Sequence, residues 1–170
     1  MNLGFSQEIN GNPSNFIEKI WASIILNKLD GINKVQYHAY AALYNNQFNE
    51  NWDGFMEEKK PKLHTIRSGK RWKAGDLIHF VIDTSPTTYF QFAPVFKCYS
   101  VQDIEIRNVS GQKKRPIVYI EGREIQLLEN HRSILPELAV NDGFESINDF
   151  FAYFNTDFTG QLVHWTEFNY

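Results

Sequence analysis

The stretch KPKLHTIRSGKRWKAGD, from Lys60 to Asp76, combines a short strand pattern with a dense group of cations. Seven of the 17 Lys and Arg residues of this 170-residue chain fall between positions 59 and 73, and none follows Arg132. The net charge is only −3, so the local placement of the cations, and not the total charge, indicates a binding face. We therefore expect a ligand-binding surface in this stretch.

Strand patterns dominate the chain after residue 62, and helix patterns lie on either side of them. Parallel βαβ units are not evident, so the pattern predicts an α+β fold built around a small, curved sheet or barrel. The expected helices are residues 12–31, residues 34–44 and a segment capped by Ser146-x-x-Asp149. The expected strands are residues 63–67, 77–82, 90–95, 99–106 and 162–166. A hairpin turn is expected at Glu121-Gly122.

The first expected helix begins at Asn12-Pro13, with proline in its first turn, and Gly31 is placed to end it. Its apolar residues recur at helical spacing, and an isolated pair of helices is not stable alone. We therefore expect four of these side chains to be buried: Phe16, Ile20, Trp21 and Ile24.

Composition excludes several classes of site. Cys98 is the only cysteine, and the five histidines stand far apart without an HxxxH pair, so neither an internal disulfide nor a metal site is expected. The start lacks the basic and apolar regions of a secretory signal, and the longest apolar run is too short to span a bilayer. A cytoplasmic protein that needs no cofactor, metal or membrane is the expectation.

The motif Lys62-x-x-Thr65-Ile66-Arg67 is the first candidate for chemistry. Side chains alternate along a strand, so Thr65 and Arg67 should point one way and Ile66 the other. A threonine hydroxyl needs a neighbouring base to act as a nucleophile, and a lysine serves as that base only when burial or nearby cations lower its pKa. The alternative is an ordinary strand with solvated basic flanks.

The cations that follow the motif, with Trp72 among them, are the second candidate. Basic side chains hold phosphates, and an exposed indole stacks on a base, whereas a large apolar side chain beside a strand is usually core. The binding hypothesis uses five residues: Arg67, Lys70, Arg71, Trp72 and Lys73.

Asn141-Asp142-Gly143-Phe144 is the third candidate, and alone it favours a simple turn. His164, like His79, is interpreted as a packing residue whose ring nitrogens have hydrogen-bond partners.

The KxxTIR element, the RWKAGD that follows it and the later NDGF before a phenylalanine-rich helix resemble the ASCH domains of the PUA-like superfamily. The resemblance covers about residues 62–170. It implies a PUA-like mixed β-barrel over 51–170, with an inserted hairpin near 108–128 and an N-terminal helical extension over 1–50.

The threonine form of the motif is similar to small bacterial amidohydrolases that remove the acetyl group from acetylcytidine. The commoner family motif is GxKxxExR, and here Lys60 stands at the glycine and Thr65 at the glutamate. The resemblance implies Lys62 as the activating base, Thr65 as the nucleophile and Asp142 as the acid, with Asp142 one methylene shorter than the glutamate expected there.

Three functions follow from these features. The first is binding of RNA, or of a nucleotide or modified nucleoside, through a basic cleft that contains the five residues from Arg67 to Lys73 named above. The second is deacetylation of acetylcytidine. The third is a protein-interaction module that uses the N-terminal helices.

Overall fold

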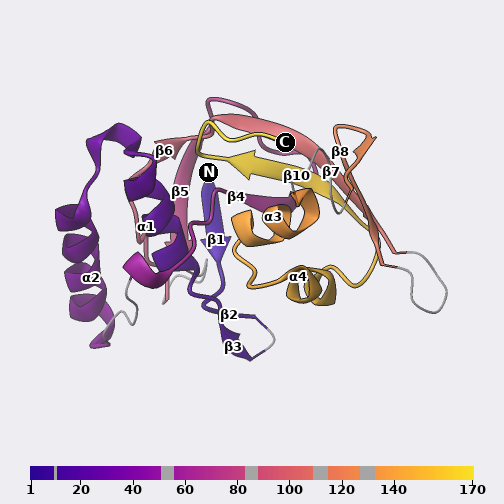
Figure 1. Ribbon diagram of the computed structural model, residues 1–170. Helices are drawn as coiled ribbons and strands as arrows, with labels where there is room; N and C mark the ends of the chain where they lie inside the picture. The colour runs from indigo at the N-terminus through magenta and orange to yellow at the C-terminus, as the bar shows by residue number, and fades with distance from the viewer. Residues whose placement is uncertain (10, 51–55, 83–87, 109–114, 127–132) are drawn as a thin grey trace. The chain divides into compact units, whose positions relative to one another are not determined.

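The computed structural model of the chain describes residues 1–9, 11–50, 56–82, 88–108, 115–126 and 133–170 (Figure 1). Its helices are α1 (Phe16–Leu26), α2 (Lys34–Phe48), α3 (Ile134–Asn141) and α4 (Ile147–Tyr153), with 3-10 turns η1 (Leu29–Gly31) and η2 (Met56–Glu58). Its strands are β1 (Asn2–Phe5), β2 (Glu8–Ile9), β3 (Asn12–Pro13), β4 (His64–Ser68), β5 (Leu77–Ile82), β6 (Phe96–Lys97), β7 (Ser100–Arg107), β8 (Ile117–Ile120), β9 (Arg123–Glu124) and β10 (Phe158–His164).

The described strands form sheets of three, five and two strands, and none of these sheets closes into a barrel. Together with four helices, they make a mixed α+β fold, so the α+β part of the prediction is confirmed, whereas the described strands do not form the predicted barrel. The chain divides into two compact units that are interleaved in sequence: a first unit of Met1–Lys62 with Asp76–Lys97, and a second unit of Leu63–Gly75 with Cys98–Tyr170. The expected domain boundary at residues 50–51 falls at the edge of a segment outside the described residues and stays a prediction.

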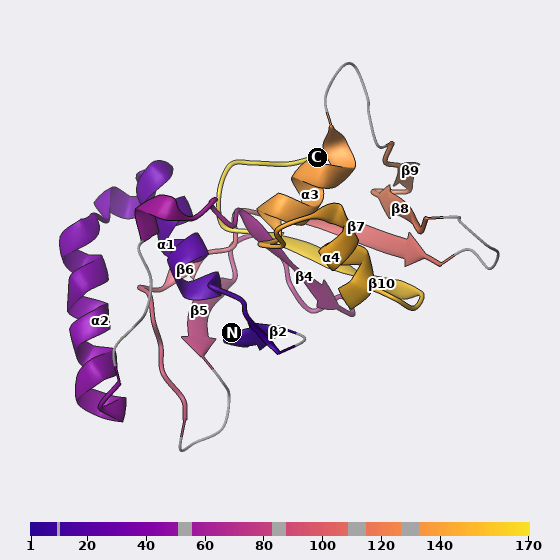
Figure 2. The same ribbon diagram turned by 60° about the horizontal axis from the view of Figure 1, so that its bottom comes forward.

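The first unit contains a small sheet, in the order β1-β5-β6, and the helices α1 and α2, which lie side by side (Figures 1 and 2). Trp21 of α1 is fully buried, and its indole N–H donates to the carbonyl of Phe92 at 2.9 Å. The ring of Tyr37 in α2 packs edge-on against this indole, with 5.5 Å between the ring centroids. Of the four side chains expected to be buried in this helix, Ile20, Trp21 and Ile24 are fully buried and Phe16 is half-buried.

The ends of α1 differ from the prediction. Pro13 lies outside the helix because it pairs with Glu8 in the β2–β3 hairpin, and the helix starts only after Asn15. At the other end, α1 stops at Leu26, and Gly31 belongs to the separate turn η1. Helix α2 is confirmed and extends beyond the predicted end to Phe48.

The second unit contains the antiparallel sheet β4-β10-β7-β8-β9, with α3 and α4 on one of its faces (Figure 1). The predicted hairpin is confirmed: Ile120 pairs with Arg123, and Glu121 and Gly122 both have positive φ, as a two-residue hairpin turn requires. The predicted helix cap is also confirmed, because Ser146 Oγ accepts the backbone N–H of Asp149 at 3.2 Å. Residues 109–114 and 127–128 of the expected insertion lie outside the described residues.

One predicted strand is wrong. Residues 90–95 do not form a regular strand; Gln91 makes an isolated bridge with Val81, and regular pairing resumes only at β6.

Candidate functional site

Strand β4 carries the Thr65-Ile66-Arg67 part of the motif along one edge of the five-stranded sheet (Figure 2). Alternation along the strand separates its side chains onto two faces. Residues directly opposite one another on paired strands share a face. Gln161 of β10 is paired with Arg67 on one side and with Asp103 of β7 on the other, so these three share one face, and alternation places Thr65 on it as well. His64 and Ile66 lie on the opposite face, as the alternation predicted for Ile66.

The basic loop, residues 68–75, connects β4 to the next strand and is fixed to the face that carries Arg67. The side chain of Gln161 accepts the Trp72 backbone N–H at 3.0 Å and donates to the Trp72 carbonyl at 3.2 Å. The Gly75 N–H donates to the carbonyl of Cys98 at 2.8 Å and closes the loop. Both attachments act on backbone groups of the loop and use none of its charged side chains.

The cations of the basic loop project outward. Lys70, Arg71 and Lys73 are all exposed, and Lys70 forms an ion pair with the carboxylate of Asp103. Arg67 is partly buried on the strand itself; burial lowers the pKa of its guanidinium, and the nearby Asp142 carboxylate opposes that shift. An arginine guanidinium is effectively always protonated in proteins, so Arg67 remains cationic.

The side chain of Trp72 is buried, unlike those of its cationic neighbours in the loop. Its side chain is only 6% exposed, so the core-packing alternative applies and the indole is not available to stack on a ligand. The loop therefore presents three exposed cations around one buried anchor.

Asp142 lies at the outer edge of β4. It follows the last turn of α3, and its Oδ1 accepts the backbone N–H of Ile66 at 3.0 Å, while the carbonyl of Asn141 accepts the N–H of Leu63 at 2.8 Å. The end of α3 thus supplies acceptors to an edge strand that would otherwise present unpaired N–H groups. The second unit brings Asp142 to the strand that carries Thr65 and Arg67.

A buried polar cluster adjoins Asp142, and sequence reasoning missed it. His64 Nδ1 lies 3.6 Å from Asp142 Oδ1, and His64 Nε2 lies 2.9 Å from the hydroxyl of Tyr170. Asn141 Nδ2 donates to the same hydroxyl at 3.0 Å. The sequence carries no signal for this cluster, because its members come from segments up to 106 residues apart.

His164 completes the cluster and corrects an expectation. It pairs directly with His64 across β4 and β10, and the two ring centroids are 5.1 Å apart. Its side chain is fully buried, yet neither ring nitrogen has a hydrogen-bond partner among the described residues, so the interpretation of satisfied nitrogens is wrong. His79 does have a partner, Gln91 Oε1 at 3.1 Å.

His164 is expected to make the free energy of unfolding depend on pH. Burial, with a further contribution from His64, lowers the pKa of His164 from 6.5 to about 3. Below pH 6.5, His164 binds a proton in the unfolded chain but not in the folded chain. The contribution of His164 to the free energy of unfolding is therefore complete above that pH and is lost as the pH falls toward 3. From pH 7 to pH 5 the free energy of unfolding should drop by about 2 kcal/mol through this residue.

Urea titrations at the two pH values check this expectation, with His164→Gln as the variant that cannot titrate. Between pH 7 and pH 5, the free energy of unfolding should drop by about 2 kcal/mol less in the variant than in the wild type. An equal drop in both proteins would show that His164 is not responsible.

Lys62 belongs to the first unit. Its side chain is 1% exposed, and its Nζ lies 4.6 Å from the ring centroid of Phe16 and 6.0 Å from that of Phe5, both in that unit. Lysine is almost never buried to this extent, so the desolvation that the catalytic hypothesis requires of Lys62 is present.

Two further findings concern the described part of the chain. It contains no cluster of three or more His, Cys, Asp or Glu side chains arranged to hold a metal ion. None of its helices has the length and apolar character needed to cross a membrane.

Comparisons of the chain with protein families, with curated proteins and with solved structures found no significant match.

Proposed function

We propose that this chain is an ASCH-type, PUA-like module that binds RNA or a nucleotide through the phosphates, using Arg67 and the basic loop. The observation that carries the proposal is the pair of hydrogen bonds between Gln161 and the backbone of Trp72. They hold Lys70, Arg71 and Lys73 in a fixed loop beside the strand face of Arg67. Cations that are already positioned lose less conformational entropy when a phosphate binds.

The family assignment is part of the same proposal. The KxxTIR strand and the last strand of the chain pair along their length, from Gly160 opposite Ser68 to His164 opposite His64. This pairing places the last strand beside the motif strand, which fits the closing strand that the resemblance implies. The NDGF segment also supports it, because Asp142 is hydrogen-bonded to the motif strand.

Binding of a short single-stranded RNA should weaken as salt rises. Three or four phosphate contacts give a slope of log K against log salt of about −2 to −3, or a loss of roughly 20- to 50-fold between about 50 and 200 mM salt. Fluorescence anisotropy of a labelled oligonucleotide measures this slope. An affinity that stayed constant over the range would contradict a phosphate-dominated contact.

The second candidate is deacetylation of acetylcytidine, with Lys62, Thr65 and Asp142 in the roles that the family resemblance implies. The burial of Lys62 supports it, because desolvation disfavours the charged form of a lysine.

The amidohydrolase candidate predicts that the protein releases acetate from acetylcytidine and that Thr65→Ala and Lys62→Met abolish the release, whereas Thr65→Ser retains part of it. A coupled acetate assay measures the release. RNA affinity separates the two functions, because a binding role tolerates Thr65→Ala with a modest loss. Absence of acetate from the wild-type protein across the pH range would remove this candidate.

A further inference from the structure

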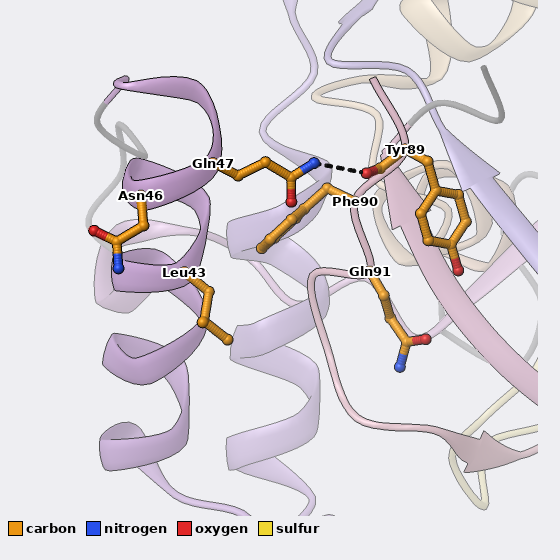
Figure 3. Close-up of a pocket in the computed structure, with 6 residues that line it drawn as sticks. All are labelled: Leu43, Asn46, Gln47, Tyr89, Phe90 and Gln91. Carbon is orange, nitrogen blue, oxygen red and sulfur yellow. Dashed lines mark hydrogen bonds between the residues drawn. The ribbon is translucent and has the colours of Figure 1, made fainter. Parts of the chain in front are cut away.

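The second unit carries an exposed aromatic ring at the end of α4. Tyr153, the last residue of this helix, is 52% exposed. By contrast, Trp72 of the basic loop is only 6% exposed. Phe90, at a surface hollow of the first unit (Figure 3), is also 6% exposed, and its ring packs on those of Tyr44 and Phe48. Of these rings at the surface, Tyr153 is the one that a ligand can reach.

The ring of Tyr153 is held in place by two buried phenylalanine rings. Its centroid lies 5.5 Å from that of Phe144 and 4.9 Å from that of Phe154. The contact with Phe154 is edge-on, with 81° between the ring planes. A ring that is already positioned loses less conformational entropy when another ring stacks on it.

The same aromatic cluster adjoins the motif strand through Phe144. This residue follows Asp142 by two positions, and Asp142 Oδ1 accepts the N–H of Ile66, the residue before Arg67. Burial lowers the pKa of Arg67, whereas Asp142 and Tyr153 both oppose that shift. The phenol of Tyr153 is thus close enough to act on the charge of the guanidinium.

A second set of contacts joins the cluster to Arg67 through β10. The ring of Phe154 packs on that of Phe158, with 5.0 Å between the centroids. A Cβ on Gly160 would lie 2.8 Å from the Phe158 ring and 2.9 Å from the carbonyl carbon of Arg67. The aromatic cluster therefore borders β4 at the position of Arg67.

We infer that Tyr153 stacks on an unpaired base beside the phosphate that Arg67 binds, so that the module prefers single-stranded RNA to duplex RNA. Every base has a π-face, so one exposed ring accepts any of them. Bases in a duplex stack on one another, whereas those of single strands are open to aromatic side chains. The inference rests on the proposed function and gives Tyr153 the stacking role that the sequence suggested for Trp72.

The test uses fluorescence anisotropy with the full chain and three labelled probes: a short single-stranded RNA, the same backbone with abasic sites in place of the bases, and a duplex. Tyr153→Ala should weaken binding of the single strand at least about fivefold, and Tyr153→Phe, which keeps the ring, should restore it. Tyr99→Ala is the matched control, because Tyr99 is also 52% exposed and belongs to the same unit; its affinity should equal that of the wild type.

The abasic probe tests the inference without any substitution. It presents the same phosphates and no base, so the wild type should bind it at least about fivefold more weakly than the single-stranded RNA. Tyr153→Ala should bind these two probes equally, because its stacking surface is gone. The wild type should also bind the single strand more tightly than the duplex.

The salt dependence separates failure of this inference from failure of the proposed function. Tyr153→Ala removes no charge, so the slope of log K against log salt should remain that of the wild type. The inference alone is overturned if the wild type shows that slope but binds the abasic probe or the duplex as tightly as the single strand. It is also overturned if Tyr153→Ala loses no more affinity than Tyr99→Ala. Absence of salt-dependent RNA binding overturns both the inference and the proposed function.

Discussion

Gly160→Ala is expected to lower the free energy of unfolding by about 3 kcal/mol or more, because the new methyl group has no space. Gly160 lies in β10 between two partners, Ser68 of β4 and Ile104 of β7. A Cβ at this position would lie 2.9 Å from the carbonyl carbon of Arg67, closer still to its oxygen, and 2.8 Å from the ring of Phe158. The phenyl ring is able to rotate, but the backbone of Arg67 moves only if β4 separates from β10.

Urea unfolding followed by circular dichroism measures this loss. Thr159→Ala is the control, because Thr159 is the exposed neighbour of Gly160 in the same strand. The control should change stability by less than about 1 kcal/mol. If Gly160→Ala lowered the free energy of unfolding no more than the control, β4 would not approach β10 as closely as described.

Local patterns predicted the elements whose signals lie within a few residues. The apolar spacing of α1, the strand β5, the turn at Glu121-Gly122 and the cap at Ser146 were all read correctly from neighbouring positions. Helix α3 was not predicted; it contains Pro136, a residue that normally breaks a helix interior. Pro136 lies in the first turn, where the missing N–H costs nothing.

Elements that depend on distant partners could not be predicted. Strand β1 exists because it pairs in parallel with β5, with Asn2 opposite His79, and its four residues carry little pattern of their own. The segment 90–95 has strand composition, yet only Gln91 finds a bridge partner. Strand propensity is realised only where a partner strand completes the hydrogen bonds.

The candidate site shows the same limit. Alternation along β4 was enough to predict that Thr65 and Arg67 share a face. The anchor of the basic loop was not predictable, because Gln161 is 89 residues from Trp72. Without that contact, an indole among cations has two equally reasonable interpretations, and the structure selects the buried one.

Reversal of the three exposed loop cations, Lys70→Glu, Arg71→Glu and Lys73→Glu together, is expected to weaken RNA binding at least about a hundredfold, equivalent to roughly 3 kcal/mol. Each substitution removes an attraction to phosphate and adds a repulsion. The fold should be retained, because the backbone of Trp72 and Gly75 and the buried indole hold the loop, and the exposed ion pair between Lys70 and Asp103 contributes little to stability.

The most direct test of the proposed function is the RNA affinity of this triple variant at about 0.1 M salt, where interactions between charges more than about 10 Å apart are screened. The control is a second triple variant, Lys28→Glu, Lys34→Glu and Arg123→Glu, which changes the net charge equally at exposed positions outside the basic loop. The proposal predicts a loss of about a hundredfold for the loop variant and at most a few-fold for the control. Equal losses in the two variants, or no loss in either, would contradict phosphate binding by the basic loop.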